Sequence, residues 1–81
     1  MEKAVRKLNR AETALTSARE ELATTTEWRR VSSDQVEAGT ANRSTFLDAD
    51  ASMLNAQADF IRADYDRSVA AADVARLTGT R

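Results

Sequence analysis

Apolar and small side chains recur every seven residues through the first half of the chain. Leu8, Leu15 and Leu22 form one series, and Val36 lies two heptads beyond its last member. A second series precedes the first by four residues and consists of small side chains: Ala4, Ala11, Ala18, Thr25 and Ser32. Two interleaved series of this kind are typical of the a and d positions of a coiled coil. The first half of the chain is therefore predicted to be one long helix with a single seam.

The second half carries the same seven-residue repeat. One series begins at Leu47 and a second begins four residues later, at Ala51. The members of the two series are Leu47, Leu54, Ile61, Ser68 and Ala75, and Ala51, Ala58, Tyr65 and Ala72. This pattern predicts a second helix whose large side chains lie mostly in the first of these series.

The two seams match when the chain is folded back on itself. Pairing residues whose numbers sum to 83 joins an a position to a d position in every layer, as an antiparallel coiled coil requires. The layers are Val36 with Leu47, Leu22 with Ile61, Ala18 with Tyr65, Leu15 with Ser68, and Ala11 with Ala72. We therefore expect an all-α fold, an antiparallel two-helix coiled-coil hairpin that occupies residues 1–81 as a single unit.

The turn is expected where this pairing reverses direction. Gly39 suits the left-handed position that ends many helices. Thr45 is a candidate N-cap, with Asp48 three residues later completing a pattern similar to a capping box. The predicted boundaries are about 2–38 for the first helix, 39–44 for the tip and about 45–78 for the second helix.

The second predicted helix has a further apolar stripe roughly opposite its seam. Large members lie at heptad spacing, and alanines accompany them: Phe46, Met53, Phe60, Val74 and Leu77, with Ala49, Ala56, Ala63 and Ala70. A single hairpin leaves such a stripe uncovered, and uncovered apolar stripes mark association surfaces. We expect Phe46, Met53, Phe60, Val74 and Leu77 to form a lateral association face. Self-association, as an antiparallel four-helix dimer or a higher oligomer, would then cover it. In the alternative interpretation, Phe46 covers the turn and the alanines only favour helix formation.

Composition excludes several kinds of site. The chain has no proline, cysteine or histidine and only two glycines, whereas 16 of its 81 residues are alanine. Disulfide scaffolds, thiolate or histidine metal sites and histidine-based catalytic triads are therefore absent. No pair of carboxylates has the apolar surroundings that would tune one of them as an acid. We predict a protein that is not an enzyme and that holds no catalytic, cofactor or metal site.

Charge is balanced overall, with a net charge of −1, but the chain begins with a basic cluster of Lys3, Arg6, Lys7 and Arg10. One interpretation is a nucleic-acid or anionic-surface contact, and the other is a solvated helix face, which we favour. Basic residues are unfavourable at a helix N-terminus, so the helix is expected to begin further upstream in a longer parent. No apolar run reaches the length of a signal peptide or membrane span, so we expect a soluble segment that does not insert into a membrane.

Several short motifs occur in a fixed order around Gly39. They are Ala38-Gly39-Thr40, Leu47-Asp48-Ala49, Leu54-Asn55-Ala56, Ala63-Asp64-Tyr65 and Leu77-Thr78-Gly79. This order and spacing resembles the periplasmic hairpin of TolC-type outer-membrane efflux and secretion channels, with a preference for the second of that family's internal repeats. The family often has a β-branched residue immediately before the glycine, where this chain has Ala38.

The resemblance implies a place in a larger assembly. Channels of this family are trimers whose hairpins pack side by side into a periplasmic tunnel for efflux or type I protein secretion. Their hairpin tips dock a membrane-fusion adaptor, which would involve Val36, Ala38, Gly39, Thr40, Asn42 and Arg43 here. In such a tunnel Asp50, Gln57 and Asp64 could face the lumen, although a solvated acidic helix face is the simpler reading. The expected location is the periplasm, within a parent protein of the bacterial outer membrane.

Two single residues and one alternative function remain open. Trp28 lies beside the seam and is either an interface anchor or a partly covered surface residue. Arg29 occupies a seam position, where its alkyl stem can pack while the guanidinium reaches water. The alternative to a channel fragment is a stand-alone coiled-coil interaction or scaffold module.

Overall fold

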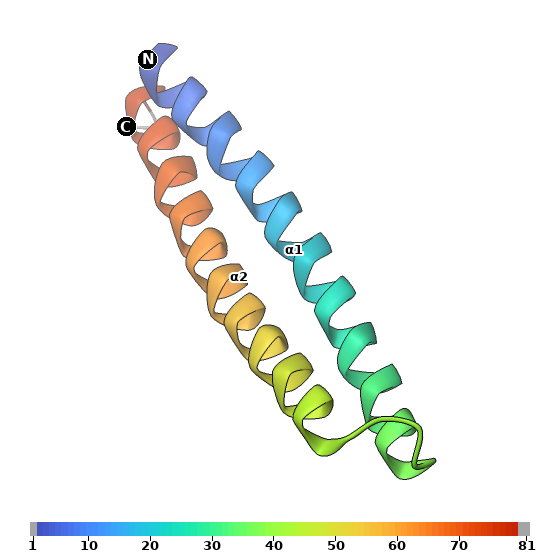
Figure 1. Cartoon of the computed structure of the whole chain (residues 1–81). Helices are drawn as coiled ribbons and strands as arrows, with labels where there is room; N and C mark the ends of the chain where they lie inside the picture. Colours follow the sequence, from blue (N-terminus) through green and yellow to red (C-terminus); the bar gives the residue numbers. More distant parts are fainter. Residues whose placement is uncertain (1, 80–81) are drawn as a thin grey trace.

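The computed structural model describes residues 2–79 and consists of two long helices joined by a short tip. Helix α1 spans Glu2–Glu37 and helix α2 spans Arg43–Leu77. The helices run antiparallel and lie side by side, so that the start of α1 and the end of α2 are at the same end of the rod (Figure 1). The described part contains no strand, and the molecule measures 61 × 14 × 14 Å. The expectation of an all-α hairpin is thus confirmed, whereas a single chain leaves its oligomeric state untested.

The tip is organised by backbone hydrogen bonds at the end of α1. Gly39 has a φ of 79°, as predicted for a left-handed residue after a helix. The Gly39 N–H donates to the Val36 carbonyl at 3.1 Å, and the Thr40 N–H donates to the Gln35 carbonyl at 2.9 Å. This pair of bonds is the Schellman arrangement, which satisfies carbonyl groups that the helix end would otherwise leave unpaired.

Asn42 caps the start of α2, so the prediction that Thr45 is the N-cap is wrong. The Asn42 side-chain oxygen accepts a hydrogen bond from the Thr45 backbone N–H at 3.2 Å. It also accepts from the Ser44 hydroxyl at 2.6 Å. Asparagine is among the best N-cap residues, and capping at residue 42 makes Thr45 the third residue of the helix. Helix α2 therefore begins at Arg43, two residues before the predicted start.

The seam of α1 lies where the sequence places it. Leu15, Thr25 and Ser32 are buried, and the other members of the two α1 series are half-buried. The Thr25 hydroxyl donates to the Glu21 carbonyl within its own helix, which satisfies this buried polar group. One regular stripe on a helix whose remaining surface is polar was sufficient to identify the buried face of α1.

The buried face of α2 is opposite to the predicted one. Its four buried residues are Ala49, Ala56, Ala63 and Ala70. Phe46, Met53, Phe60 and Val74 flank this row and are half-buried. The predicted seam residues Leu47, Leu54, Ile61 and Tyr65 are instead more than half exposed, so the predicted layers do not form.

The register also differs from the prediction. Two ion pairs between the helices join Arg29 with Asp50 and Glu12 with Arg67, and a cation–π contact joins Arg19 with the Phe60 ring; Arg29 also reaches the Phe46 ring, one turn of α2 before Asp50. In the first three of these contacts the two residue numbers sum to 79, not to 83. Side-chain size explains the choice of face. The small series of α1 and the alanine row of α2 let the helices approach closely, and the larger side chains then pack along both edges.

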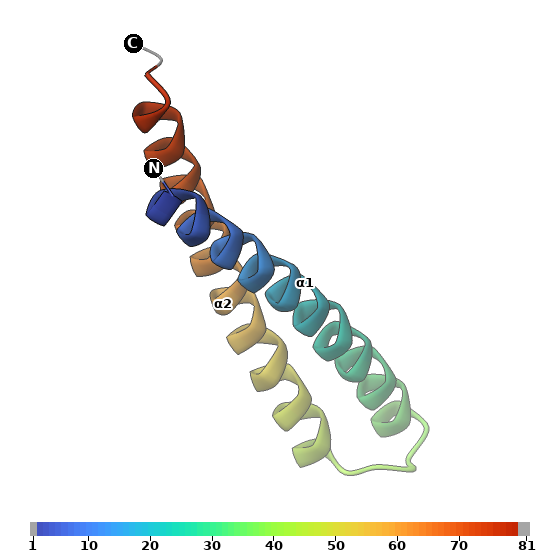
Figure 2. The ribbon, with the colours of Figure 1, turned by 90° about the horizontal axis from the view of Figure 1, so that it is seen from above.

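Figure 2 shows the rod from above: α1 passes in front of α2 near its start, and the two arms separate toward the tip at the opposite end. The basic start of α1 therefore lies beside the C-terminal end of α2. Lys3 and Lys7 line one shallow depression together with Asp73, Arg76 and Leu77. Cations are favoured near a helix C-terminus, where carbonyl groups are unpaired. The antiparallel partner thus gives the basic cluster a favourable environment that α1 alone would not provide.

Candidate functional site

One face of α2 carries a row of large apolar side chains that the hairpin leaves exposed. Leu47 and Leu54 are 51% and 52% exposed, and Ile61 and Tyr65 are 68% and 69% exposed. With the small exposed residues between and beyond them they form a continuous row, which we call the outer stripe. Its members are Leu47, Ala51, Leu54, Ala58, Ile61, Tyr65, Ser68 and Ala72.

The outer stripe lies diametrically opposite the contact with α1. At about 100° per residue, Leu54 and Ala58 are each about 160° away from the buried Ala56, on either side. Helix α2 is therefore apolar on two opposite faces, one of which is covered. An amphipathic helix of a finished two-helix unit needs only one such face. Packing within the hairpin therefore accounts for one apolar face of α2 and does not account for the second.

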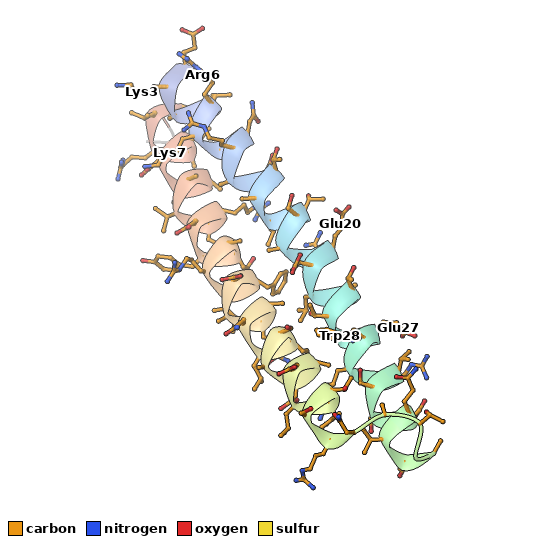
Figure 3. The ribbon with its side chains drawn as sticks, viewed as in Figure 1. Lys3, Arg6, Lys7, Glu20, Glu27 and Trp28 are labelled. Atoms are coloured by element: carbon orange, nitrogen blue, oxygen red, sulfur yellow. The ribbon has the colours of Figure 1, made fainter. Side chains whose placement is uncertain are left out.

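Helix α1 has no comparable second face. The residues that point away from its seam are exposed and mostly charged: Arg6, Thr13, Glu20, Glu27 and Asp34. Figure 3 shows Glu20 and Glu27 on the side of α1 that faces away from α2. Trp28 is 43% exposed, which matches a partly covered surface residue but does not test a role as an interface anchor. The two arms are thus unequal, and only α2 offers an extended apolar surface.

A shallow groove runs beside the outer stripe, between the two helices. Its floor consists of alanines from both helices, and Tyr65 and Val69 form part of its wall. Charged residues line its rim: Lys7, Arg10, Asp59, Arg62 and Asp66. The groove exists because alanine side chains leave space beside the contact that they make. It widens the apolar surface next to Tyr65.

The predicted lateral association face is therefore not free in the hairpin. Phe46, Met53, Phe60 and Val74 lie along the contact with α1, and only Leu77 is more than half exposed. Arg29 lies over the Phe46 ring with its guanidinium carbon 5.1 Å from the ring centre. Arg19 lies over the Phe60 ring at 6.0 Å. These contacts use the aromatic side chains to hold the two helices together.

The predicted lumen-facing residues do not form a uniform row. Asp50 accepts a hydrogen bond from Arg29 Nε at 2.6 Å and is half-buried. Gln57 and Asp64 are exposed. The arginine therefore engages both Asp50 and Phe46, whereas the prediction left its guanidinium free in water. Gln57 and Asp64 retain the solvated position of the simpler interpretation.

The predicted docking residues cluster at the tip of the rod. Ala38, Gly39, Thr40, Asn42 and Arg43 are exposed, and Val36 is half-buried under them. The Asn42 side chain is occupied by its capping bonds, so it is held in place. The exposed positions are thus brought together in space at one end of the rod.

One surface ion pair shifts two pKa values. The Arg30 guanidinium hydrogen-bonds to Glu27 one turn away and attracts its negative charge, which lowers the pKa of Glu27. The same contact raises the pKa of Arg30. Both side chains lie on the outer surface of α1, where such pairs stabilise a helix only slightly.

Comparisons with known proteins identify no relative. No family model matches the chain. Neither the curated proteins nor the solved structures contain a match. In residues 2–79 no helix is long and apolar enough to cross a membrane, and no group of acidic side chains is placed to hold a metal ion.

Proposed function

We propose that this hairpin is a helix-packing module whose outer stripe binds another α-helix. The observation that carries this proposal is the exposure of Leu47, Leu54 and Ile61 at heptad spacing, with Tyr65 four residues further on the same face. Such spacing suits a helix better than a loop or a sheet edge, because a second helix presents side chains at the same repeat.

The physical reason for binding is burial of apolar surface. Each Leu or Ile that moves from water to a packed contact contributes about 1.5–3 kcal/mol before the entropic cost of association is subtracted. Four such side chains along one row are enough for specific association if the partner is complementary. Charged residues border the row on both sides, among them Asp48, Arg62 and Asp64, and these restrict which partner fits.

A fluorescent probe on the outer stripe tests this proposal directly. The chain has no cysteine, so Ile61→Cys can be labelled with an environment-sensitive dye, with Glu20→Cys as the control on the outer face of α1. Emission from position 61 should shift to the blue when a partner helix binds, and emission from position 20 should not. Two partners are tried, a second copy of the chain and the α-hairpin of a membrane-fusion adaptor. If neither changes the emission at position 61, the proposal fails.

The tunnel wall of a TolC-type channel is the setting that we propose for this module. Two observations support it, namely the two apolar faces of α2 and the exposed, hydrogen-bonded tip around Gly39. In a tunnel wall α2 would have a neighbour on its second apolar face, and the tip would face the adaptor. The stand-alone coiled-coil module remains the alternative, since it uses the same outer stripe.

Adaptor docking distinguishes the two settings. Binding of an adaptor hairpin can be measured by calorimetry for the unchanged chain and for Arg43→Glu, which reverses a charge at the exposed tip. Arg6→Glu makes the same change at the opposite end and serves as the matched control. The channel setting predicts that only Arg43→Glu weakens binding. Equal effects of both variants, or no binding at all, would favour the independent module.

A further inference from the structure

The outer stripe has a composition that fits a second copy of itself. Its eight residues form four pairs whose numbers sum to 119, so a twofold axis between positions 59 and 60 maps the stripe onto itself. The pairs are Leu47 with Ala72, Ala51 with Ser68, Leu54 with Tyr65, and Ala58 with Ile61. Three of the four layers contain at least one small side chain, which allows the helices to approach closely.

Edge charges and the overlap of the two stripes together favour this register over its neighbours. In an antiparallel pair each edge faces the same edge of the other copy. A register with sum 112 brings Asp50 near Asp64 of the other copy and Asp48 near Arg62, and it leaves Ser68 and Ala72 without partners in the stripe. A register with sum 126 brings Arg62 near Arg62 and Asp64 near Asp64. A sum of 119 places Asp64 beside Gln57 and Asp48 beside Val69, with no like charges opposed.

The unequal arms explain why such an assembly would stop at two copies. The outer stripe lies opposite the α1 contact, so two hairpins joined through it form a row of four helices with the two α1 arms outermost. The outward surface of α1 is charged, as Glu20 and Glu27 illustrate (Figure 3). A row that ends in mostly charged faces offers no second extended apolar stripe, among the described residues, to recruit a third hairpin.

Resting on the proposed function of the outer stripe, we infer that its partner is a second copy of this chain. The two α2 helices pack antiparallel, with residue numbers summing to 119. The result is a twofold-symmetric dimer with the helix order α1, α2, α2, α1. Its two tips lie at opposite ends, so this dimer is a form of the stand-alone module and not of a tunnel wall, in which all tips face the adaptor. This dimer differs from the one expected from the sequence, because it uses Leu47, Leu54 and Ile61 and leaves the Phe46 side of α2 in the hairpin contact.

Disulfide cross-linking between single-cysteine chains tests the geometry. Chains with Leu47→Cys are mixed with chains carrying Ala72→Cys, both at exposed positions, and oxidised slowly; circular dichroism confirms that each variant is folded. The mixed disulfide should form at least about tenfold faster than the Leu47→Cys homodimer, because the dimer holds the thiols at a millimolar local concentration. A dominant Leu47→Cys homodimer would show a parallel pair and overturn the inference. Preferred linkage of Leu47→Cys with Tyr65→Cys, or of Leu54→Cys with Ala72→Cys, would overturn the register.

Two substitutions of opposite charge at Val69 provide a second, independent test of the register. Val69→Lys introduces a cation near Asp48 of the other copy, and Val69→Asp introduces a like charge at the same place. Sedimentation equilibrium should show a dimer dissociation constant about threefold or more lower for the lysine variant than for the aspartate variant. Equal constants would contradict the register. A strictly monomeric chain would overturn the dimer, whereas a blue shift of the probe at position 61 with an adaptor hairpin alone would leave the proposed function standing.

Discussion

Arg29 of α1 donates a hydrogen bond from its Nε to Oδ1 of Asp50 of α2 at 2.6 Å, while its guanidinium lies over the Phe46 ring. The arginine thus joins the two helices through a carboxylate and an aromatic ring near the tip. Both partners belong to α2 and are four residues apart, one helical turn.

We expect replacement of Arg29 to lower the free energy of unfolding more than replacement of Asp50. Asp50→Asn should cost less than about 1 kcal/mol, because the ion pair is partly open to solvent. Arg29→Gln should cost more, since it also removes the contact with the ring, which contributes about 0.5–1 kcal/mol. Urea denaturation of both single variants and of the double variant measures this difference. Equal losses for the two single variants would contradict a role for Phe46.

The stability of the hairpin should depend strongly on the size of the side chains in the alanine row of α2. Ala56→Leu places extra volume in the helix contact and should destabilise the hairpin by about 1–3 kcal/mol. Ala51→Leu makes the same change on the outer stripe and should leave the stability of the hairpin nearly unchanged. Urea denaturation followed by circular dichroism compares the two. The opposite ranking would mean that the helices pack through the other face of α2.

Ser32 offers a stabilising substitution. Its hydroxyl is buried and has no hydrogen-bond partner among the described residues. Ser32→Ala removes this unpaired group and improves helix propensity, so the free energy of unfolding should rise by about 1 kcal/mol. Ser17→Ala, on an exposed part of α1, reports the propensity gain alone. If both variants gain equally, the buried hydroxyl carries no cost.

Gly39 should resist replacement for reasons of backbone conformation alone. Its φ of 79° is unfavourable for residues with a Cβ, although an added Cβ would meet no other atom within 4 Å. Gly39→Ala should therefore cost about 1–2 kcal/mol, and Gly39→Asn should cost less because asparagine tolerates this conformation better. Thermal denaturation of the two variants gives the comparison. A fully neutral alanine variant would indicate that the tip adopts another conformation.

The Glu27–Arg30 pair predicts a small effect of pH. The pKa of Glu27 is lowered below its usual 4.5, so its contribution to stability is present above the unfolded-state pKa and is lost as pH falls through the lower folded-state value. Carbon-13 NMR titration of the Glu27 carboxyl should show this lowered pKa. In Arg30→Gln the pKa should return toward its ordinary value. An unchanged titration in that variant would assign the shift to another group.

The sequence identified the fold because two regular heptad repeats and one glycine leave few alternatives. It also identified the buried face of α1, where Leu8, Leu15 and Leu22 define a single stripe on a polar helix. Gly39 marked the end of α1, but Asn42, not Thr45, is the N-cap of α2. Both residues are good caps, and only the backbone geometry decides between them.

The buried face of α2 could not be read from α2 alone, because that helix has two apolar faces. Ranking the faces by large side chains favours Leu47, Leu54 and Ile61, whereas the hairpin buries Ala49, Ala56 and Ala63. The fit to the small residues of α1 decides which face of α2 is buried, and this fit is a property of the two helices together. The same error exchanged the two candidate surfaces of α2. The face with Phe46, which was expected to be free, lies against α1, and the face with Leu47, which was expected to lie against α1, is exposed.

The tip combines a Schellman end at Gly39 with a side-chain cap at Asn42, and only Thr40 and Ala41 lie between these two residues. Both ends of the connection are therefore fixed by hydrogen bonds within the chain. The loss of conformational freedom at the tip is incurred when the hairpin folds, not when another molecule arrives. A molecule that contacts the tip meets a shape that already exists, so its affinity is not reduced by the ordering of a loop.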